Sequence, residues 1–140
     1  MAAIINFSPG MDDGGLPVMM ADIIKGNLRD KPQRENDFNA LNGNIYIQAE
    51  DADVDMTMVF EKGVMTVYNG RIGKPKICIN TDSTTLLDLA NINIKFGLPY
   101  YFDKAGLGVI KKLVTRELKL KGLLTHPIML TRFTKLMSCQ

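Results

Sequence analysis

The chain has few of the residues from which catalytic and metal sites are built. Its 140 residues include one histidine, two cysteines and no tryptophan. The single histidine, His126, excludes a site made of several histidines and leaves any serine–histidine pair dependent on one residue. Because His126 directly precedes Pro127, we interpret its ring as a hydrogen-bonding group of the local turn. No Gly-x-Ser-x-Gly sequence occurs. We therefore expect no enzyme activity, no metal and no cofactor.

The two cysteines, Cys78 and Cys139, match no metal-binding or redox spacing. Unpaired thiols are typical of a reducing compartment, so a cytoplasmic location is expected. The first residues have no basic start, and their apolar run is too short for a signal peptide. No segment approaches the roughly 18 consecutive apolar residues that a transmembrane helix requires.

Charge of one sign is also scarce, because 17 Lys and Arg oppose 15 Asp and Glu for a net charge of +2. This balance argues against a nucleic-acid partner, which normally needs a concentrated basic surface. One modest basic cluster consists of Lys111, Lys112, Arg116, Lys119 and Lys121. It is either an ordinary solvated face or a surface that attracts an anionic membrane or lipid head group. A transient contact with a membrane surface is therefore left open.

Three aspartates at alternate positions, Asp51, Asp53 and Asp55, come nearest to a cation site. The central glycine and terminal glutamate of a calcium-binding loop are missing around them. We therefore expect Asp53 and Asp55 to face solvent from one side of a strand.

Hydrophobic periodicity divides the chain into helical and extended segments. Residues 1–16 contain the proline, glycines and paired aspartates of a flexible arm, and Pro17 begins a helix. From Asn44 the apolar residues alternate with a period of two. Short strands are predicted over 44–48, 54–61, 64–68 and 77–79. The tight turns between them predict an antiparallel meander.

The second half of the chain begins with a helix that Thr81 or Asp82 is expected to cap. The remaining expected elements are an extended segment over 91–96, a break at 97–99, an aromatic loop at 100–102, a helix over 105–116, a strand over 118–121 and a last helix from Pro127. This order predicts an α+β fold, a mainly antiparallel sheet of about five strands covered by helices. One domain over 17–140 is expected, since no linker or repeat divides the chain.

The last helix has a continuous apolar face of about 120°, the width of a core-facing stripe. This stripe consists of Met129, Leu130, Phe133, Leu136 and Met137. Ile128 falls outside it and is expected to be exposed. Burying five such side chains contributes about 8–15 kcal/mol as an upper bound. The helix must therefore dock, either on the sheet or on a bound apolar molecule.

Four passages in this order resemble the sterol carrier protein 2-like domains of the sterol transfer family. Gly43–Ile47, Asp53–Phe60 and Gly63–Gly70 are similar to the family's first, second and third strands. Leu118–Gly122 resembles the late lysine–hydrophobic–lysine–glycine strand that precedes the family's closing helix. The resemblance spans residues 36–137.

The resemblance implies a sheet covered by helices around an apolar tunnel that has no catalytic residues. The ligands it implies are fatty acyl chains, phospholipids, sterols or isoprenoid quinones. The chain departs from the family over residues 81–116, where two predicted helices and an extended segment replace a single helix. The shape of the tunnel is therefore not carried over.

Our first hypothesis is non-catalytic binding or transfer of such a hydrophobic small molecule or lipid in an internal cavity. The nine methionines fit an adaptable pocket, although they fit an ordinary core as well. The side chains expected to line the cavity are Met56, Met58, Phe60, Leu98, Phe102, Leu130, Phe133 and Met137. The choice of strand face depends on register, because a shift of one residue reverses it.

Our second hypothesis is a protein-interaction or regulatory module of the same fold with a filled core, an accessory to an enzyme of a lipid or quinone pathway. It would pair through an exposed strand edge or through the terminal helix, and a homodimer is left open. A cavity too small for an acyl chain would favour it.

Overall fold

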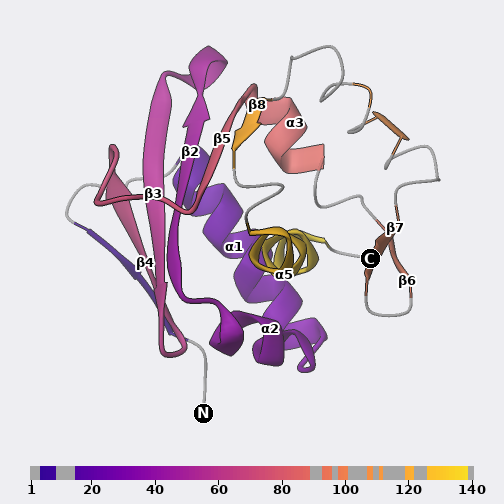
Figure 1. Ribbon diagram of the computed structural model, residues 1–140. Coiled ribbons are helices and arrows are strands. Elements are labelled where there is room, and N and C mark those ends of the chain that lie inside the picture. The colour runs from indigo at the N-terminus through magenta and orange to yellow at the C-terminus, as the bar shows by residue number, and fades with distance from the viewer. Residues whose placement is uncertain are drawn as a thin grey trace.

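The chain has the predicted α+β architecture, with helices on one face of a sheet (Figure 1). The computed structural model describes residues 4–8, 15–88, 93–95, 98–100, 107–108, 111, 119–121 and 126–138. Its helices are α1 (Leu16–Asp30), α2 (Arg34–Ala40), α3 (Ser83–Asp88) and α5 (Pro127–Met137), with a 3-10 turn, η1 (Glu50–Ala52). In Figure 1, α1, α2 and α5 lie on the same side of the sheet.

The main sheet has six strands within the described residues, in the order β1-β4-β3-β2-β5-β8. They are β1 (Ile4–Phe7), β2 (Gly43–Ala49), β3 (Val54–Glu61), β4 (Val64–Asn69), β5 (Ile77–Thr81) and β8 (Lys119–Lys121). β2, β3 and β4 form the predicted antiparallel meander. The prediction was wrong for β5, which pairs in parallel with β2. The sheet is therefore mixed.

The connection from β4 to β5 explains this parallel pairing. Residues 70–76, the crossover segment, pass over β3 and β2 on the face opposite α1, α2 and α5 (Figure 1). The buried hydroxyl of Thr57 donates a hydrogen bond to the Gly70 carbonyl (2.6 Å) and accepts one from the Ile72 N–H (3.0 Å). Asn44 Nδ2 donates to the Ile72 carbonyl at 2.9 Å. The segment thus reaches the free edge of β2.

The N-terminal segment adds an edge strand that the sequence did not reveal. β1 pairs in parallel with β4. The ammonium of Lys25, on α1, lies 5.7 Å from the centre of the Phe7 ring, a cation–π distance. Part of the arm predicted over 1–16 is therefore strand, because its short apolar run finds a partner far along the chain.

The sheet face under the helices consists of apolar side chains from alternate strand positions. These are Ile45, Ile47, Met56, Met58, Phe60, Met65, Val67, Ile77 and Ile79, each at most 3% exposed. The ring of Phe60 lies edge-to-face with two helix residues, 5.7 Å from Phe38 and 6.5 Å from Phe133 between centroids. One core therefore joins β3 to α2 and α5.

A separate two-stranded hairpin, β6 (Asn93–Lys95) and β7 (Leu98–Tyr100), follows α3 in the chain. The extended segment expected over 91–96 is confirmed at 93–95. Leu98 and Pro99 were predicted to break the strand, but they form the returning strand of the hairpin. Most of the helix predicted over 105–116 lies outside the described residues. The described residues of this range, 107, 108 and 111, are helical.

The last helix, α5, contacts α1, α2 and β7, and it reaches the sheet where Phe133 meets Phe60. Its predicted apolar stripe is buried except for Leu130, which is half-buried. Ile128 is 71% exposed, as expected. Thr134, which is not part of the predicted stripe, is also buried. Its hydroxyl can be buried because it donates to the Leu130 carbonyl (2.9 Å).

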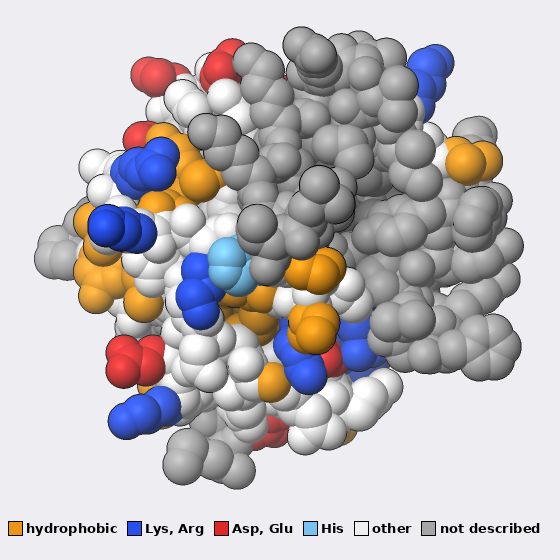
Figure 2. Space-filling model, in the orientation of Figure 1, with side chains coloured by type: hydrophobic (Ala, Val, Ile, Leu, Met, Phe, Trp, Pro, Cys, Tyr) orange, Lys and Arg blue, Asp and Glu red, His pale blue; other side chains and the backbone are white. Residues whose placement is uncertain are grey.

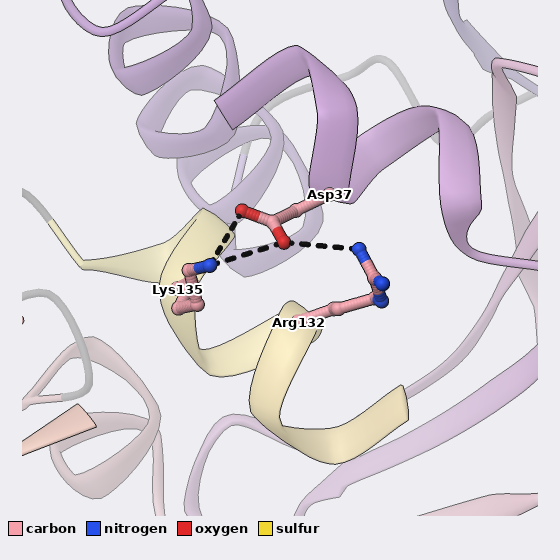
Figure 3. A network of polar contacts seen from close by, with 3 residues as sticks. All are labelled: Asp37, Arg132 and Lys135. Carbon is pink, nitrogen blue, oxygen red and sulfur yellow. Dashed lines mark hydrogen bonds and ion pairs between the residues drawn. The ribbon is translucent and has the colours of Figure 1, made fainter. Parts of the chain in front are cut away.

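Two polar contacts fix α5 on its neighbours. Asp37 of α2, whose side chain is 9% exposed, receives Arg132 Nη1 at 3.2 Å and Lys135 Nζ at 3.1 Å (Figure 3). On the other side, Asn27 Nδ2 of α1 donates to the Leu136 carbonyl at 2.6 Å. This bond satisfies one of the carbonyls that a helix C-terminus leaves unpaired.

Replacing Thr57 with valine tests how the crossover segment is held. The change leaves the Gly70 carbonyl and the Ile72 N–H without their partner. We expect the free energy of unfolding in urea to fall by about 1–3 kcal/mol. Thr66→Val is the matched control, since Thr66 stands on the same outer sheet face and should change stability by less than about 0.5 kcal/mol. Equal losses in both variants would contradict the assignment.

Replacing Asp37 with asparagine tests how α5 is held. Arg132 and Lys135 then lose their counter-charge, so we expect the free energy of unfolding in urea to fall by about 2 kcal/mol. This is below the about 3–5 kcal/mol of a fully buried pair, because the Arg132 side chain is 35% exposed. Asp30→Asn removes the exposed pair with Arg29 and should cost under about 1 kcal/mol. A loss in Asp37→Asn no larger than this would refute the role of Asp37.

Candidate functional site

The predicted cavity residues fall into three groups. Five of them are buried together in the core, each at most 1% exposed: Met56, Met58, Phe60, Phe133 and Met137. Leu130 is half-buried and packs against the same core. Leu98 begins β7, and Phe102 lies outside the described residues. The structure thus brings the β3 and α5 groups together, and they meet where the Phe60 and Phe133 rings touch.

Methionine is concentrated at this meeting of sheet and helices. Six methionines are buried in the described core: Met20, Met56, Met58, Met65, Met129 and Met137. Unbranched thioether side chains adopt several shapes at low cost, so a core built from them can repack. Met20 and Met65, from α1 and β4, were not predicted to line the site. Only the tertiary fold shows that they share one core with β3.

The three aspartates that came nearest to a cation site lie at the η1 end of the sheet. A polar pocket of about 270 Å³ is found there. It is lined by Gln48, Ala49, Glu50, Asp53, Val54 and Asp55. Glu50 accepts a hydrogen bond from Asn80 (3.3 Å), and Asp55 accepts one from the Tyr46 hydroxyl (3.1 Å). Asp53 is exposed as expected, whereas Asp55 is half-buried. The described residues contain no cluster of His, Cys, Asp or Glu that could hold a metal ion.

The resolved pKa shifts at this end have structural causes. Ser83 donates to Asp51 from its hydroxyl (2.6 Å) and its N–H (2.8 Å), and these bonds lower the pKa of Asp51. Burial raises the pKa of Tyr46, and its hydrogen bond to Asp55 raises it further. Asp82 caps α3, as predicted, by accepting from the Thr85 N–H at 2.6 Å. The Asp51–Ser83 bonds tie η1 to α3.

His126 occupies the position before the first turn of α5. It is half-buried, and its carbonyl accepts the Leu130 N–H at 3.1 Å. This contact is made by the backbone, and the side chain makes no capping hydrogen bond to α5; a hydrogen-bonding role of the ring in the turn stays a prediction. No helix in the described part of the chain combines the length and apolar composition needed to cross a membrane.

The sequence matches no protein-family model, and a search of curated proteins finds no significant match. Solved structures, in contrast, share the arrangement of sheet and helices. The sterol carrier protein domain 2 of Helicoverpa armigera is 14% identical and superposes with a TM-score of 0.60, covering 95% of each chain. A UbiJ-SCP2 ubiquinone synthesis protein is 12% identical with a TM-score of 0.58, covering 87% of this chain and 91% of the other. The chain therefore has the sterol carrier protein 2-like fold.

Proposed function

We propose that the protein binds an apolar ligand without catalysis, in the interior between β3 and α5, and passes it on. The observation that carries this proposal is the gathering of six methionines in one apolar core. That interior contains the side chains that a long hydrocarbon needs. Buried polar groups nearby, such as Asn27 and Asp37, are already bonded to α5. Affinity would come from non-directional burial of apolar surface.

The fold likeness supports the same class of ligand. One neighbour is named as a sterol carrier protein domain and the other as a ubiquinone synthesis protein. Sterols and ubiquinone are both largely apolar, as are fatty acyl chains and phospholipid tails. The ligand is proposed at this level of chemistry, a molecule with an extended apolar part.

Binding would require α5 to shift relative to β3. Side chains such as Met58 and Phe133 are 0% exposed, so a ligand placed between them would have to displace part of this packing. The helix is suited to such a shift because its buried face includes flexible Met129 and Met137 as well as rigid Phe133. Its two polar contacts, at Asp37 and Asn27, set the cost of moving it.

Two measurements on the full chain test the proposal. Native mass spectrometry of protein purified from bacteria should show a co-purifying lipid, and a fluorescent fatty acid should bind with saturation. If neither is seen, the proposal fails. A stable dimer found together with these negative results would instead favour the interaction module.

The methionines offer a sharper test. Replacing Met58 and Met137 together with leucine conserves volume and should cost less than about 3 kcal/mol in stability. Because branched leucine adapts less readily than methionine, we expect fatty-acid affinity to fall by about 3- to 10-fold in a fluorescence titration. Met19→Leu, at a position 48% exposed, is the control and should bind like the wild type. Unchanged affinity in the double variant would remove the methionines from the site.

A further inference from the structure

Basic and apolar side chains lie along the crossover segment, on the outer sheet face, and along the exposed side of α5, which the segment approaches at the end of the sheet where β2 begins. The crossover segment contains Arg71, Lys74 and Lys76 and no acidic residue, and residues 126–138 contain Arg132 and Lys135 and no acidic residue. Figure 2 shows Lys and Arg side chains with hydrophobic ones over the crossover segment and around His126. We call this surface, consisting of Arg71, Ile72, Lys74, Lys76, Ile128 and Arg132, the basic face.

The crossover segment presents its side chains from a fixed backbone. Thr57 and Asn44 hold the backbone on both sides of Ile72, whose side chain remains 38% exposed. The Arg71 guanidinium lies 5.6 Å from the centre of the Tyr46 ring, and both Arg71 and Lys74 are exposed. The segment thus holds an apolar side chain between two cations. Because its backbone is already fixed, docking on a partner would carry no entropic cost for ordering that backbone.

The two parts of the basic face adjoin at Lys76. A methyl group placed on Gly43 would meet Lys76 Cδ at 2.8 Å and Met129 Cε at 3.3 Å, so the side chains of Lys76 and of Met129, in the first turn of α5, both flank Gly43. Lys76 Nζ also donates to the Asn42 carbonyl at 3.1 Å. Ile128, on that same turn, is 71% exposed. The basic face thus contains one exposed isoleucine on the crossover segment and one on α5.

Of the cations on the basic face, Arg132 is paired with an acidic side chain, whereas Arg71 and Lys74 are exposed. Asp37 is enclosed between Arg132 and Lys135, and Asp55 accepts the Tyr46 hydroxyl. Other acidic residues, Glu50, Asp51 and Asp53, lie at the η1 end of the sheet. The crossover segment begins at that end, because the Gly70 N–H donates to the Asp55 carbonyl at 3.1 Å. Its last cation, Lys76, lies beside Gly43 at the opposite end of β2.

We propose that the basic face docks on an anionic lipid bilayer. A bilayer surface accepts both features at once, since its phosphates and carboxylates attract Lys and Arg while its interfacial region accepts isoleucine. A nucleic acid would leave Ile72 and Ile128 without a partner. This inference builds on the proposed function, because docking would bring an apolar cargo to its source or acceptor membrane.

Sedimentation of the full chain with vesicles tests the docking. We expect binding to phosphatidylcholine vesicles with about 30% phosphatidylserine, little binding to phosphatidylcholine alone, and loss of binding near 1 M salt. Arg71→Glu/Lys74→Glu should weaken binding by at least about 25-fold, since each cation removed is worth about fivefold. Ile128→Ser, which leaves charge unchanged, should weaken it by about tenfold.

Lys25→Glu/Arg29→Glu on α1 is the control, because it changes net charge equally at exposed positions outside the basic face. This control should bind vesicles within about twofold of the wild type. Its basic face is unchanged, and salt screens charges that lie more than a Debye length from the lipid. An equal loss of vesicle affinity in both double variants would overturn the docking, as would a wild type whose vesicle binding does not increase with phosphatidylserine. So would an Ile128→Ser variant that binds normally while an oligonucleotide displaces the wild type.

Fatty-acid binding measured without vesicles separates this inference from the proposed function. Arg71→Glu/Lys74→Glu should bind the fluorescent fatty acid like the wild type, because neither residue lies in the core. A wild type that docks on vesicles but binds no fatty acid would refute the proposed function and leave the docking intact. A wild type that binds fatty acid but no vesicles would refute the docking alone.

Discussion

The apolar inner face of the sheet has to be covered, and most of the structure follows from this need. β2 to β5 present nine almost fully buried side chains on that face, and leaving them in water would cost more than the stability of a typical domain. The helices α1, α2 and α5 supply the cover. Because α5 comes from the far end of the chain, the last residues are part of the core, and Asp37 and Asn27 serve to align it.

The opposite face of the sheet is organised by different forces. The crossover segment covers part of it with hydrogen bonds from Thr57 and Asn44. Because alternate residues of a strand point to opposite faces, β3 directs Met56 and Met58 inward and Thr57 outward, so one strand positions both the apolar interior and the segment that carries the basic face. The proposed binding site and the proposed docking surface are therefore supported by the same strand.

Periodicity in the sequence correctly predicted which apolar side chains of β3 and α5 face the core, because this depends on local strand and helix geometry. Strict alternation over β3 indicated an inner face of Met56, Met58 and Phe60, and these are the buried side chains. The 3.6-residue period similarly indicated the buried side of α5. Features that depend on distant partners were missed, namely the pairing of β1 with β4, the parallel β5 and the carboxylate of Asp37 between two cations of α5. The burial of Thr134 was not predicted, because a helical wheel does not consider its bond to the Leu130 carbonyl. Of the basic cluster noted over 111–121, Lys112 and Arg116 lie outside the described residues. The basic face is formed by residues elsewhere in the chain.

The helix α5 connects the two proposals, because its opposite sides belong to different sites. Phe133 and Met137 face the core, while Ile128 and Arg132 belong to the basic face. If both proposals hold, Arg132 has two competing anionic partners, Asp37 in solution and lipid phosphates at a membrane. Competition for this cation would weaken the contact that fixes α5 on α2, next to the proposed interior site. Docking would then lower the cost of the shift that ligand exchange requires, and this coupling would fade as salt screens the lipid charge.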